Sequence, residues 1–264
     1  MATDDVTVVI VAYNNQATIR ACIDSLLKFS PRSKVIVVDN CSKDNTRKIL
    51  KNYGNKLQLI ESAENMGFAR GNNLALEFVK TEYIVFLNPD SRIKEDVSGK
   101  LKMDLEENRQ FGLIGAKLIS PSGVVQKSVR NFPTISRAFQ EYILNRRGAF
   151  DFYDPEADTL TEVETVTGAC FIIRKNIFEE ARMFNEKYFM YFEDIELCRV
   201  VRRMGLKVGF DPRVKVEHAM GASGTGLNTP SMARVSEKKY HPLFSYWVLQ
   251  GIFTYRRILK KITR

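Results

Sequence analysis

The chain has 264 residues, of which 44% are hydrophobic and 27% charged, and its formal net charge is +9. This length allows one large domain with a substantial core, and the composition excludes a disordered or collagen-like chain. The four cysteines form no Cys-x-x-Cys pair and the acidic start at Met1–Asp5 does not resemble a signal peptide, so we expect a reduced, cytoplasmic protein.

The first 90 residues alternate between strand-like and helix-like segments. Apolar runs rich in β-branched residues, typical of parallel strands buried on both faces, occur at 6–11, 34–38, 57–60 and 83–87. Apolar residues at helical spacing occur at 19–27, 46–53 and 71–79. This order predicts an α/β nucleotide-binding half in which ligands gather beyond the carboxyl ends of the strands. The missing Gly-x-Gly-x-x-Gly argues against a dinucleotide dehydrogenase.

The second half has a more mixed pattern. It predicts strands at 112–119, 124–129, 163–174 and 207–216, a hairpin turn at 121–123, a helix at 194–204 and a flexible Gly-rich stretch at 221–226. We therefore divide a domain at 1–230 into a nucleotide-binding half, about 1–110, and an acceptor half, about 111–230. Residues 231–264 are expected to form a basic, aromatic C-terminal helical tail.

The tail combines aromatic residues with most of the excess positive charge. Its longest uncharged run, Pro242–Tyr255, is too short to span a bilayer. An amphipathic helix of this composition is typical of proteins that lie on an anionic membrane surface, which predicts a peripheral position at the inner face of the cell membrane. The alternatives are a helix packed on the domain with a solvated basic end, or a homodimer interface.

Asn88, Pro89 and Asp90 follow the fourth predicted strand. Because side chains alternate along an extended chain, Asn88 and Asp90 are expected on one side, where their oxygens suit Mg²⁺ or Mn²⁺ shared with a diphosphate. The same tripeptide is also a common turn. His218 follows the last predicted strand and is expected to be a third metal ligand or a diphosphate contact, the alternative being a structural or merely exposed histidine.

Glu193 and Asp194 open a predicted helix, where capping and the helix dipole alone also favour carboxylates. The preceding aromatic residues, which include Tyr191 and Phe192, would shield a carboxylate from water, raise its pKa and offer flat surfaces to a sugar ring. Asp194 is therefore the candidate general base.

The segment Asn65–Asn73 brings glycines, amides and the cation of Arg70 to a predicted helix start. Backbone N–H groups at a helix start favour a bound anion. A turn followed by a helix cap would explain the same residues without any ligand.

Seven motifs, taken in order, together resemble glycosyltransferase family 2 and, more closely, its rhamnosyltransferase-like branch. They are Val9–Asn14, Val37–Asn40, Asn65–Asn73, Leu87–Asp90, Thr167–Ala169, Phe189–Asp194 and His218. The resemblance covers roughly residues 6 to 220 and implies a GT-A fold, a Rossmann-like nucleotide-binding half with a mixed central sheet. It also implies a nucleotide-diphosphate sugar donor with dTDP or UDP, a divalent Mg²⁺ or Mn²⁺, and inversion at the anomeric carbon.

The resemblance assigns roles by position. Donor-binding residues would be Ala12, Tyr13, Asn14, Asp39, Asn65, Gly67, Arg70, Asn72, Asn73, Asn88 and Pro89, with Asp39 at the pyrimidine. The metal site would hold Asp90, His218 and Asn88, where Asn88 replaces the aspartate usual in the wider family. Asp194 would be the catalytic base with Glu193 as its neighbour, and Gly168, Ala169, Tyr191 and Phe192 would meet the acceptor.

The resulting expectation is a metal-dependent inverting glycosyltransferase of polysaccharide biosynthesis. It would add a sugar, with rhamnose as one candidate, to a lipid-linked or cell-surface glycan. The alternatives are a nucleotidyltransferase, a nucleotide-sugar hydrolase, or a non-catalytic protein that binds glycans or nucleic acid. The segment Ala12–Asn15 is unlike the Gly-rich loop of nucleotidyltransferases, and charge gathered in the tail argues against a nucleic-acid groove, so we expect no nucleic-acid partner.

Overall fold

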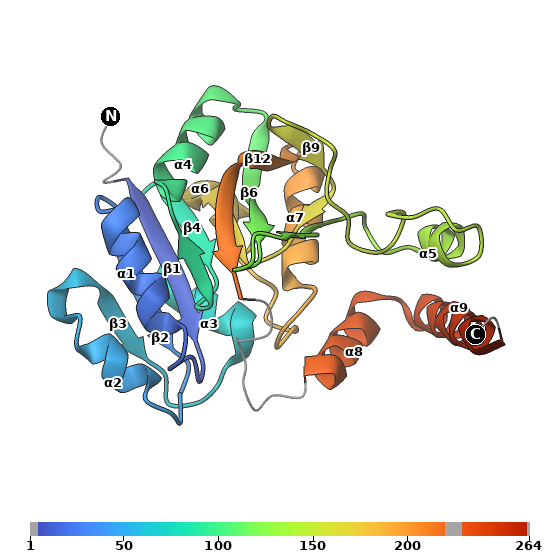
Figure 1. Cartoon of the computed structure of the whole chain (residues 1–264), viewed down its shortest axis with the longest axis horizontal. Coiled ribbons are helices and arrows are strands. Elements are labelled where there is room, and N and C mark those ends of the chain that lie inside the picture. Colours follow the sequence, from blue (N-terminus) through green and yellow to red (C-terminus); the bar gives the residue numbers. More distant parts are fainter. Residues whose placement is uncertain (1–4, 220–228, 263–264) are drawn as a thin grey trace.

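The computed structural model describes residues 5–219 and 229–262, and its centre is a ten-stranded mixed sheet with helices on both faces (Figure 1). The strand order is β3-β2-β1-β4-β11-β6-β12-β5, with β7 beside β6 and β9 beside β12, and β8 and β10 form a separate two-stranded sheet. The strands are β1 Val6–Ala12, β2 Lys34–Asp39, β3 Gln58–Glu61, β4 Tyr83–Leu87, β5 Ser91–Ile93, β6 Phe111–Ile119, β7 Val125–Gln126, β8 Val129–Arg130, β9 Thr161–Val163, β10 Thr165–Val166, β11 Cys170–Arg174 and β12 Lys207–His218. The helices are α1 Ile19–Phe29, α2 Thr46–Lys51, the 3₁₀ turn η1 Gly54–Lys56, α3 Gly67–Leu76, α4 Val97–Glu107, α5 Ile135–Tyr142, α6 Lys175–Glu180, α7 Glu193–Arg203, α8 Thr229–Tyr240 and α9 Leu243–Ile262.

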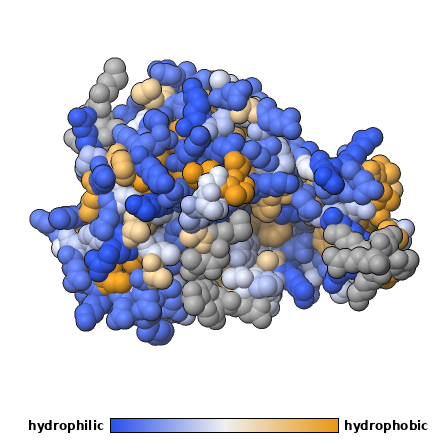
Figure 2. All heavy atoms as spheres, viewed as in Figure 1, coloured by the Kyte–Doolittle hydropathy of each residue, from blue (hydrophilic) through white to orange (hydrophobic). Residues whose placement is uncertain are grey.

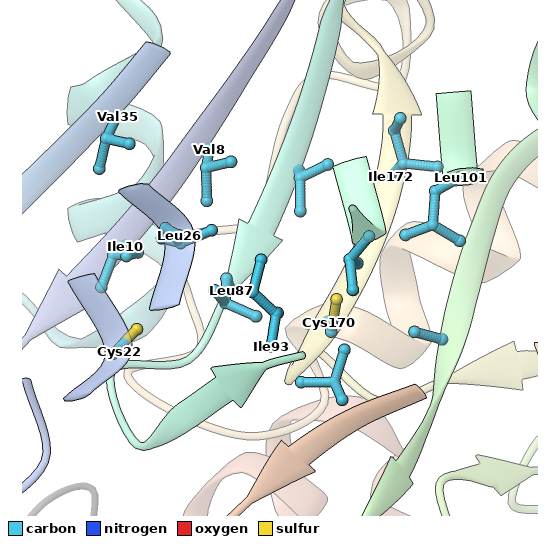
Figure 3. Close-up of a cluster of buried hydrophobic side chains, with 14 of the residues drawn as sticks. Val8, Ile10, Cys22, Leu26, Val35, Leu87, Ile93, Leu101, Cys170 and Ile172 are labelled. Atoms are coloured by element: carbon cyan, nitrogen blue, oxygen red, sulfur yellow. The ribbon is translucent and has the colours of Figure 1, made fainter. Parts of the chain in front are cut away.

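The first four strands, β3, β2, β1 and β4, are parallel, as their apolar runs predicted. Strands β2, β1 and β4 are buried on both faces, whereas the edge strand β3 has only exposed and half-buried residues, so the prediction of burial on both faces is wrong for β3. Successive residues of β1 enter opposite cores, so Val8 and Ile10 face one and Val9 faces the other. Figure 3 shows the first core, in which Ile10 and Val8 lie beside Leu26 of α1.

Helix α3 begins at Gly67, one turn earlier than the predicted start at Gly71. Gly71 therefore lies inside the helix. A Cβ at this position would lie 2.8 Å from Cγ1 of Val11, so the glycine permits close packing of α3 on β1. The glycine that looked like a helix boundary is therefore a packing residue.

Strand β11 runs antiparallel to both β4 and β6 and so joins the two halves of the sheet. The predicted single strand at 163–174 is wrong, since this stretch contains the end of β9, then β10 and β11, which pair with β12, β8 and β4 respectively. The predicted strand at 124–129 likewise divides into β7 and the start of β8. A run of apolar residues does not reveal a change of partner strand.

The tail consists of two helices, and α9 packs on α5 (Figure 1). Leu249 and Phe253 of α9 meet Ala138 and Phe150 in a small separate core. Across the described residues, no helix combines the length and apolar character required to cross a bilayer. The Gly-rich stretch 221–226 lies outside the described residues.

Candidate active site

Two consecutive residues connect the two candidate acidic centres. The carbonyl oxygen of Ala169 accepts a hydrogen bond from the Asn88 N–H at 2.9 Å, and the N–H of Gly168 donates to Oδ2 of Asp194 at 2.9 Å. These residues meet because the start of β11 pairs with the end of β4. The Asn88–Asp90 and Asp194 motifs therefore flank one short segment of chain.

Asp194 lies in the first turn of α7, where its Oδ1 accepts a hydrogen bond from the N–H of Ile195 at 2.8 Å. Burial raises the pKa of Asp194, while the N–H groups of Gly168 and Ile195 and the charge of Arg130 act in the opposite direction. Burial and the neighbouring Asp194 charge raise the pKa of Glu193 well above its usual range. The two adjacent carboxyl groups therefore titrate as one coupled pair.

Tyr191 and Phe192, which precede α7, both adopt left-handed backbone conformations with φ of 71° and 72°. Such a conformation costs a side-chain-bearing residue roughly 1–2 kcal/mol. The ring of Phe192 is only 8% exposed and packs with Tyr188 and Ile195, whereas Tyr191 is 39% exposed. Of these two candidate acceptor residues, Tyr191 is the one with an open ring.

The candidate donor segment contacts the aromatic run that leads to Asp194. The N–H of Phe68 donates to the carbonyl of Phe189 at 2.7 Å. At Gly67, φ is +79° and a Cβ would lie 2.2 Å from that same carbonyl oxygen, so only glycine fits. A main-chain hydrogen bond thus connects the candidate donor segment to the segment that leads to the candidate base.

Asn40 holds the donor segment in place and was not among the expected site residues. Its Nδ2 donates to Oδ1 of Asn65 at 2.9 Å and to the carbonyl of Gly67 at 3.0 Å, and its Oδ1 accepts from the Met66 N–H at 2.9 Å. Its position directly after Asp39 at the end of β2 was the signal that could have identified it.

The other candidate donor residues gather at the ends of β1 and β2, where Ala12 pairs with Asp39. Asp39 is fully buried and accepts from Arg47 Nε at 2.7 Å, so its carboxylate already has a cationic partner. Tyr13 is half-buried beside Asn14, whose φ is 55° and whose Oδ1 accepts from the Lys43 N–H at 2.8 Å. The predicted cluster of polar residues beyond these strands is present.

The amides of Asn72 and Asn73 are buried and bind backbone. Asn72 Nδ2 donates to the carbonyl of Phe68, and Asn73 exchanges hydrogen bonds with both backbone groups of Phe184. Arg70 is about half exposed, with its Nε 3.7 Å from Glu186. The two asparagines therefore position α3, while Arg70 is accessible.

The segment Asn88–Asp90 forms a turn, closed by a hydrogen bond from the Ser91 N–H to the Asn88 carbonyl at 3.1 Å, so the expectation of an extended chain is wrong. The turn nevertheless directs both side chains toward His218. Asn88 Nδ2 lies 3.3 Å, and Asp90 Oδ1 3.4 Å, from His218 Nε2. His218 reaches them because it pairs with Ser91 across β12 and β5.

These three side chains fit a divalent cation bound together with a diphosphate. A carboxylate, an amide oxygen and a neutral imidazole are suitable donors. Within 5–219 and 229–262 no group of three or more His, Cys, Asp or Glu side chains could hold a metal ion. Asp90 and His218 would therefore leave several coordination positions to substrate oxygens.

Comparison with known proteins concerns the chain as a whole. The family model described as Glycosyl transferase family 2 matches residues 7–182. The low-salt glycan biosynthesis hexosyltransferase Agl10 of Haloferax volcanii is 26% identical over 212 residues, which cover 78% of this chain and 64% of that protein. The rhamnosyltransferase WbbL of Escherichia coli K12 is 27% identical over 222 residues, covering 81% of this chain and 83% of WbbL.

The crystal structure of S. aureus TarS 1–349 in complex with UDP has the same fold. It superposes with a TM-score of 0.55 at 19% identity and covers 78% of this chain and 57% of that structure. The present chain thus spans less than two thirds of both TarS 1–349 and the Haloferax protein. The likeness to TarS shows a GT-A type fold.

Proposed function

This chain belongs to glycosyl transferase family 2, in its rhamnosyltransferase-like branch, and we propose that it is an inverting enzyme that uses a nucleotide-diphosphate sugar. The sugar, with rhamnose as the first candidate, passes to a hydroxyl of a glycan acceptor. The observation that carries the proposal is the pair of backbone contacts at Gly168 and Ala169, which bring Asp194 and Asn88 to the same segment.

In this mechanism Asp194 acts on the acceptor. Its carboxylate removes the proton from the acceptor hydroxyl while that oxygen forms a bond to the anomeric carbon. The bond from that carbon to the diphosphate oxygen breaks, and the nucleoside diphosphate leaves with the electron pair. Attack from the face opposite the leaving group inverts the carbon.

The diphosphate would lie at Asn88, Asp90 and His218. A divalent cation bound by these residues would supply positive charge to the leaving diphosphate. The contacts of Asn88 and Asp90 with His218 Nε2, which bring the three side chains together, support this role. The nucleotide would occupy the ends of β1 and β2, near Tyr13, Asn14 and Arg70.

The test is transfer of labelled sugar from dTDP-rhamnose and UDP-sugars, with Mn²⁺, to membrane lipid extracts and simple glycosides. Asp194→Asn should lower turnover by at least roughly 10²-fold, within the range that a general base contributes, while nucleotide affinity stays close to wild type. Glu196→Gln is the matched control, because Glu196 lies on the same helix but pairs with Lys187 and Arg199. Near-normal turnover in Asp194→Asn would reject the assignment.

The products separate the alternatives. Release of free sugar without a glycoside would indicate a nucleotide-sugar hydrolase, and release of pyrophosphate a nucleotidyltransferase. Glycan binding without turnover of any donor would indicate a non-catalytic protein.

We place the enzyme at an anionic membrane surface with a lipid-linked acceptor, and the exposed side of α9 supports this position. Phe244 and Trp247, which are 77% and 62% exposed, lie on one stripe with Tyr255 and Ile258, and the opposite side of α9 packs on α5. Figure 2 shows hydrophobic surface beside α9, at the right-hand end of the molecule around α5. Arg257 adds exposed positive charge to the helix.

Trp247 is the single tryptophan of the chain, so its fluorescence reports directly on membrane contact. Phosphatidylglycerol vesicles should shift its emission to shorter wavelength, and phosphatidylcholine vesicles should do so less. The double variant Phe244→Ser, Ile258→Ser should weaken binding at least tenfold, whereas Val124→Ser, at an exposed apolar residue elsewhere, should not. A homodimer would instead give vesicle-independent, concentration-dependent sedimentation.

A further inference from the structure

Gln126 holds His218 at two points. It lies in β7, which pairs with the end of β6 so that Gln126 is opposite Leu118. Its side-chain Nε2 donates to the backbone carbonyl of His218 at 2.7 Å, and its Oε1 lies 2.9 Å from the ring Nδ1 of the same histidine. One side chain therefore contacts both the main chain and the ring of His218.

The first contact fixes the orientation of the Gln126 amide. A carbonyl oxygen can only accept, so the NH₂ group of Gln126 must face the main chain of His218 and its oxygen must face the ring. An amide oxygen also only accepts, so the ring Nδ1 must carry the hydrogen of the second contact. A neutral imidazole has one N–H, and Nε2 is then left with its lone pair.

The lone pair points toward the candidate diphosphate site. His218 Nε2 lies 3.4 Å from Oδ1 of Asp90, and its lone pair accepts a hydrogen bond from Nδ2 of Asn88 at 3.3 Å, which agrees with the hydrogen being on Nδ1. In a neutral ring, Nε2 and the Asp90 carboxylate would place two electron-rich atoms against each other. A cation between or beside them resolves this repulsion.

We propose that Gln126 is a positioning residue that fixes His218 in the Nδ1–H tautomer and so presents Nε2 as a ligand beside Asp90. The inference rests on the proposed function for its purpose, since the cation would neutralise the sugar donor's diphosphate. The tautomer of His218 itself does not depend on whether a sugar is transferred. Partners of this kind typically change metal affinity by roughly 10- to 100-fold.

The chain offers a direct measurement because it contains only two histidines, His218 and His241. The full chain labelled with ¹⁵N-histidine is observed by long-range ¹H–¹⁵N NMR at a pH about two units above the ordinary histidine pKa, where free imidazole is neutral. The expected pattern for His218 is a protonated Nδ1 and a strongly deshielded, unprotonated Nε2. His241 provides an internal reference for the fold.

Variants at Gln126 and at its neighbour distinguish an effect on the His218 tautomer from an effect of altered packing in β7. Gln126→Leu should remove both contacts, give His218 a mixed or Nε2–H tautomer, and raise the Mn²⁺ concentration that broadens its ring signals by about tenfold. Gln126→Glu keeps an acceptor for Nδ1 and should restore the wild-type tautomer while losing the contact to the backbone. Val125→Thr, at the exposed neighbouring position of β7, is the matched control and should match wild type in both readouts.

The Nε2–H tautomer in the wild-type chain would overturn the proposal without any variant. Unchanged tautomer and Mn²⁺ broadening in a folded Gln126→Leu variant would overturn it as well. If Gln126→Leu does not fold, Gln126→Glu carries the test, because loss of the Nδ1–H pattern in that variant contradicts the proposed role. Absence of sugar transfer with the expected tautomer pattern would instead count against the proposed function alone.

Discussion

The backbone N–H of Gly168 donates to Oδ2 of Asp194 at 2.9 Å, so the candidate base is held by main chain from the start of β11. A Cβ at Gly168 would lie 3.7 Å from the Cβ of Asp194 and 3.2 Å from the ring of Phe68. The base, the donor segment and the central sheet therefore meet at this glycine. Small changes there should act on all three.

Arg130 is predicted to control the acidic limb of the pH–rate profile. Burial raises the pKa of Asp194 and the charge of Arg130 opposes that rise, so the wild-type limb should lie above the usual aspartate range. Arg130→Met removes the opposing charge and should move the limb of kcat/KM to still higher pH. Arg130→Lys, which keeps the charge, should move it less. A limb at the same pH in Arg130→Met and wild type would contradict this role.

Gly67 should tolerate no side chain. Gly67→Ala combines a φ of +79° with a clash 2.2 Å from the Phe189 carbonyl, so the free energy of unfolding should fall by more than about 2 kcal/mol. Gly123→Ala is the matched control, because its φ is +85° but no atom lies within 4 Å of the added Cβ. The control should lose only about 1 kcal/mol in urea unfolding. Equal losses of unfolding free energy in the two variants would show that the close approach of Phe189 to Gly67 does not add to the cost of a side chain there.

Asn40 should matter for donor binding. Asn40→Leu leaves the Met66 N–H and the Gly67 carbonyl without their partner, which costs roughly 1–3 kcal/mol of stability for each buried group. The affinity for UDP or dTDP, measured by calorimetry, should fall about tenfold as the loop loosens. Asn40→Asp retains the acceptor for Met66 and should lose less of both. Unchanged nucleotide affinity in Asn40→Leu would separate this loop from the donor site.

Asp104 should make stability depend on pH near neutrality. Burial and its contact with Asp211 raise the pKa of Asp104 to about 7, above that of the unfolded chain. The folded state therefore binds the extra proton, and the stability it brings is present at acidic pH and lost as pH rises through about 7. Chemical unfolding should show a decline of up to about 1.4 kcal/mol per pH unit between about pH 4, the pKa of an unfolded aspartate, and about pH 7, and no further decline from this group above that. Asp104→Asn should flatten the decline, and an unchanged slope would rule out this carboxyl as its source.

The sequence was sufficient to predict the parallel half of the sheet and the polar residues at its edge. Continuous β-branched runs such as that of β1 can only be buried on both faces, and Asn14 and Asp39 follow from the rule for strand ends. The order of motifs was also sufficient to predict the family.

The supporting contacts could not be predicted, because each joins distant parts of the chain. Nothing local shows that Gln126 meets His218, 92 residues later, or that Asn73 binds the backbone of Phe184. The change of partner between β10 and β11 depends on which strands the rest of the fold leaves available. Local periodicity carries no information on such pairings.

The left-handed backbone of Tyr191 and Phe192, directly before α7, costs stability that a glycine at either position would not lose. Tyr191→Gly would remove the steric penalty at that position but would also leave the denatured ensemble with more conformational freedom. It would take away the open ring as well, so any gain in melting temperature should be accompanied by slower turnover. We therefore expect replacement of Tyr191 to change thermal stability and turnover in opposite directions.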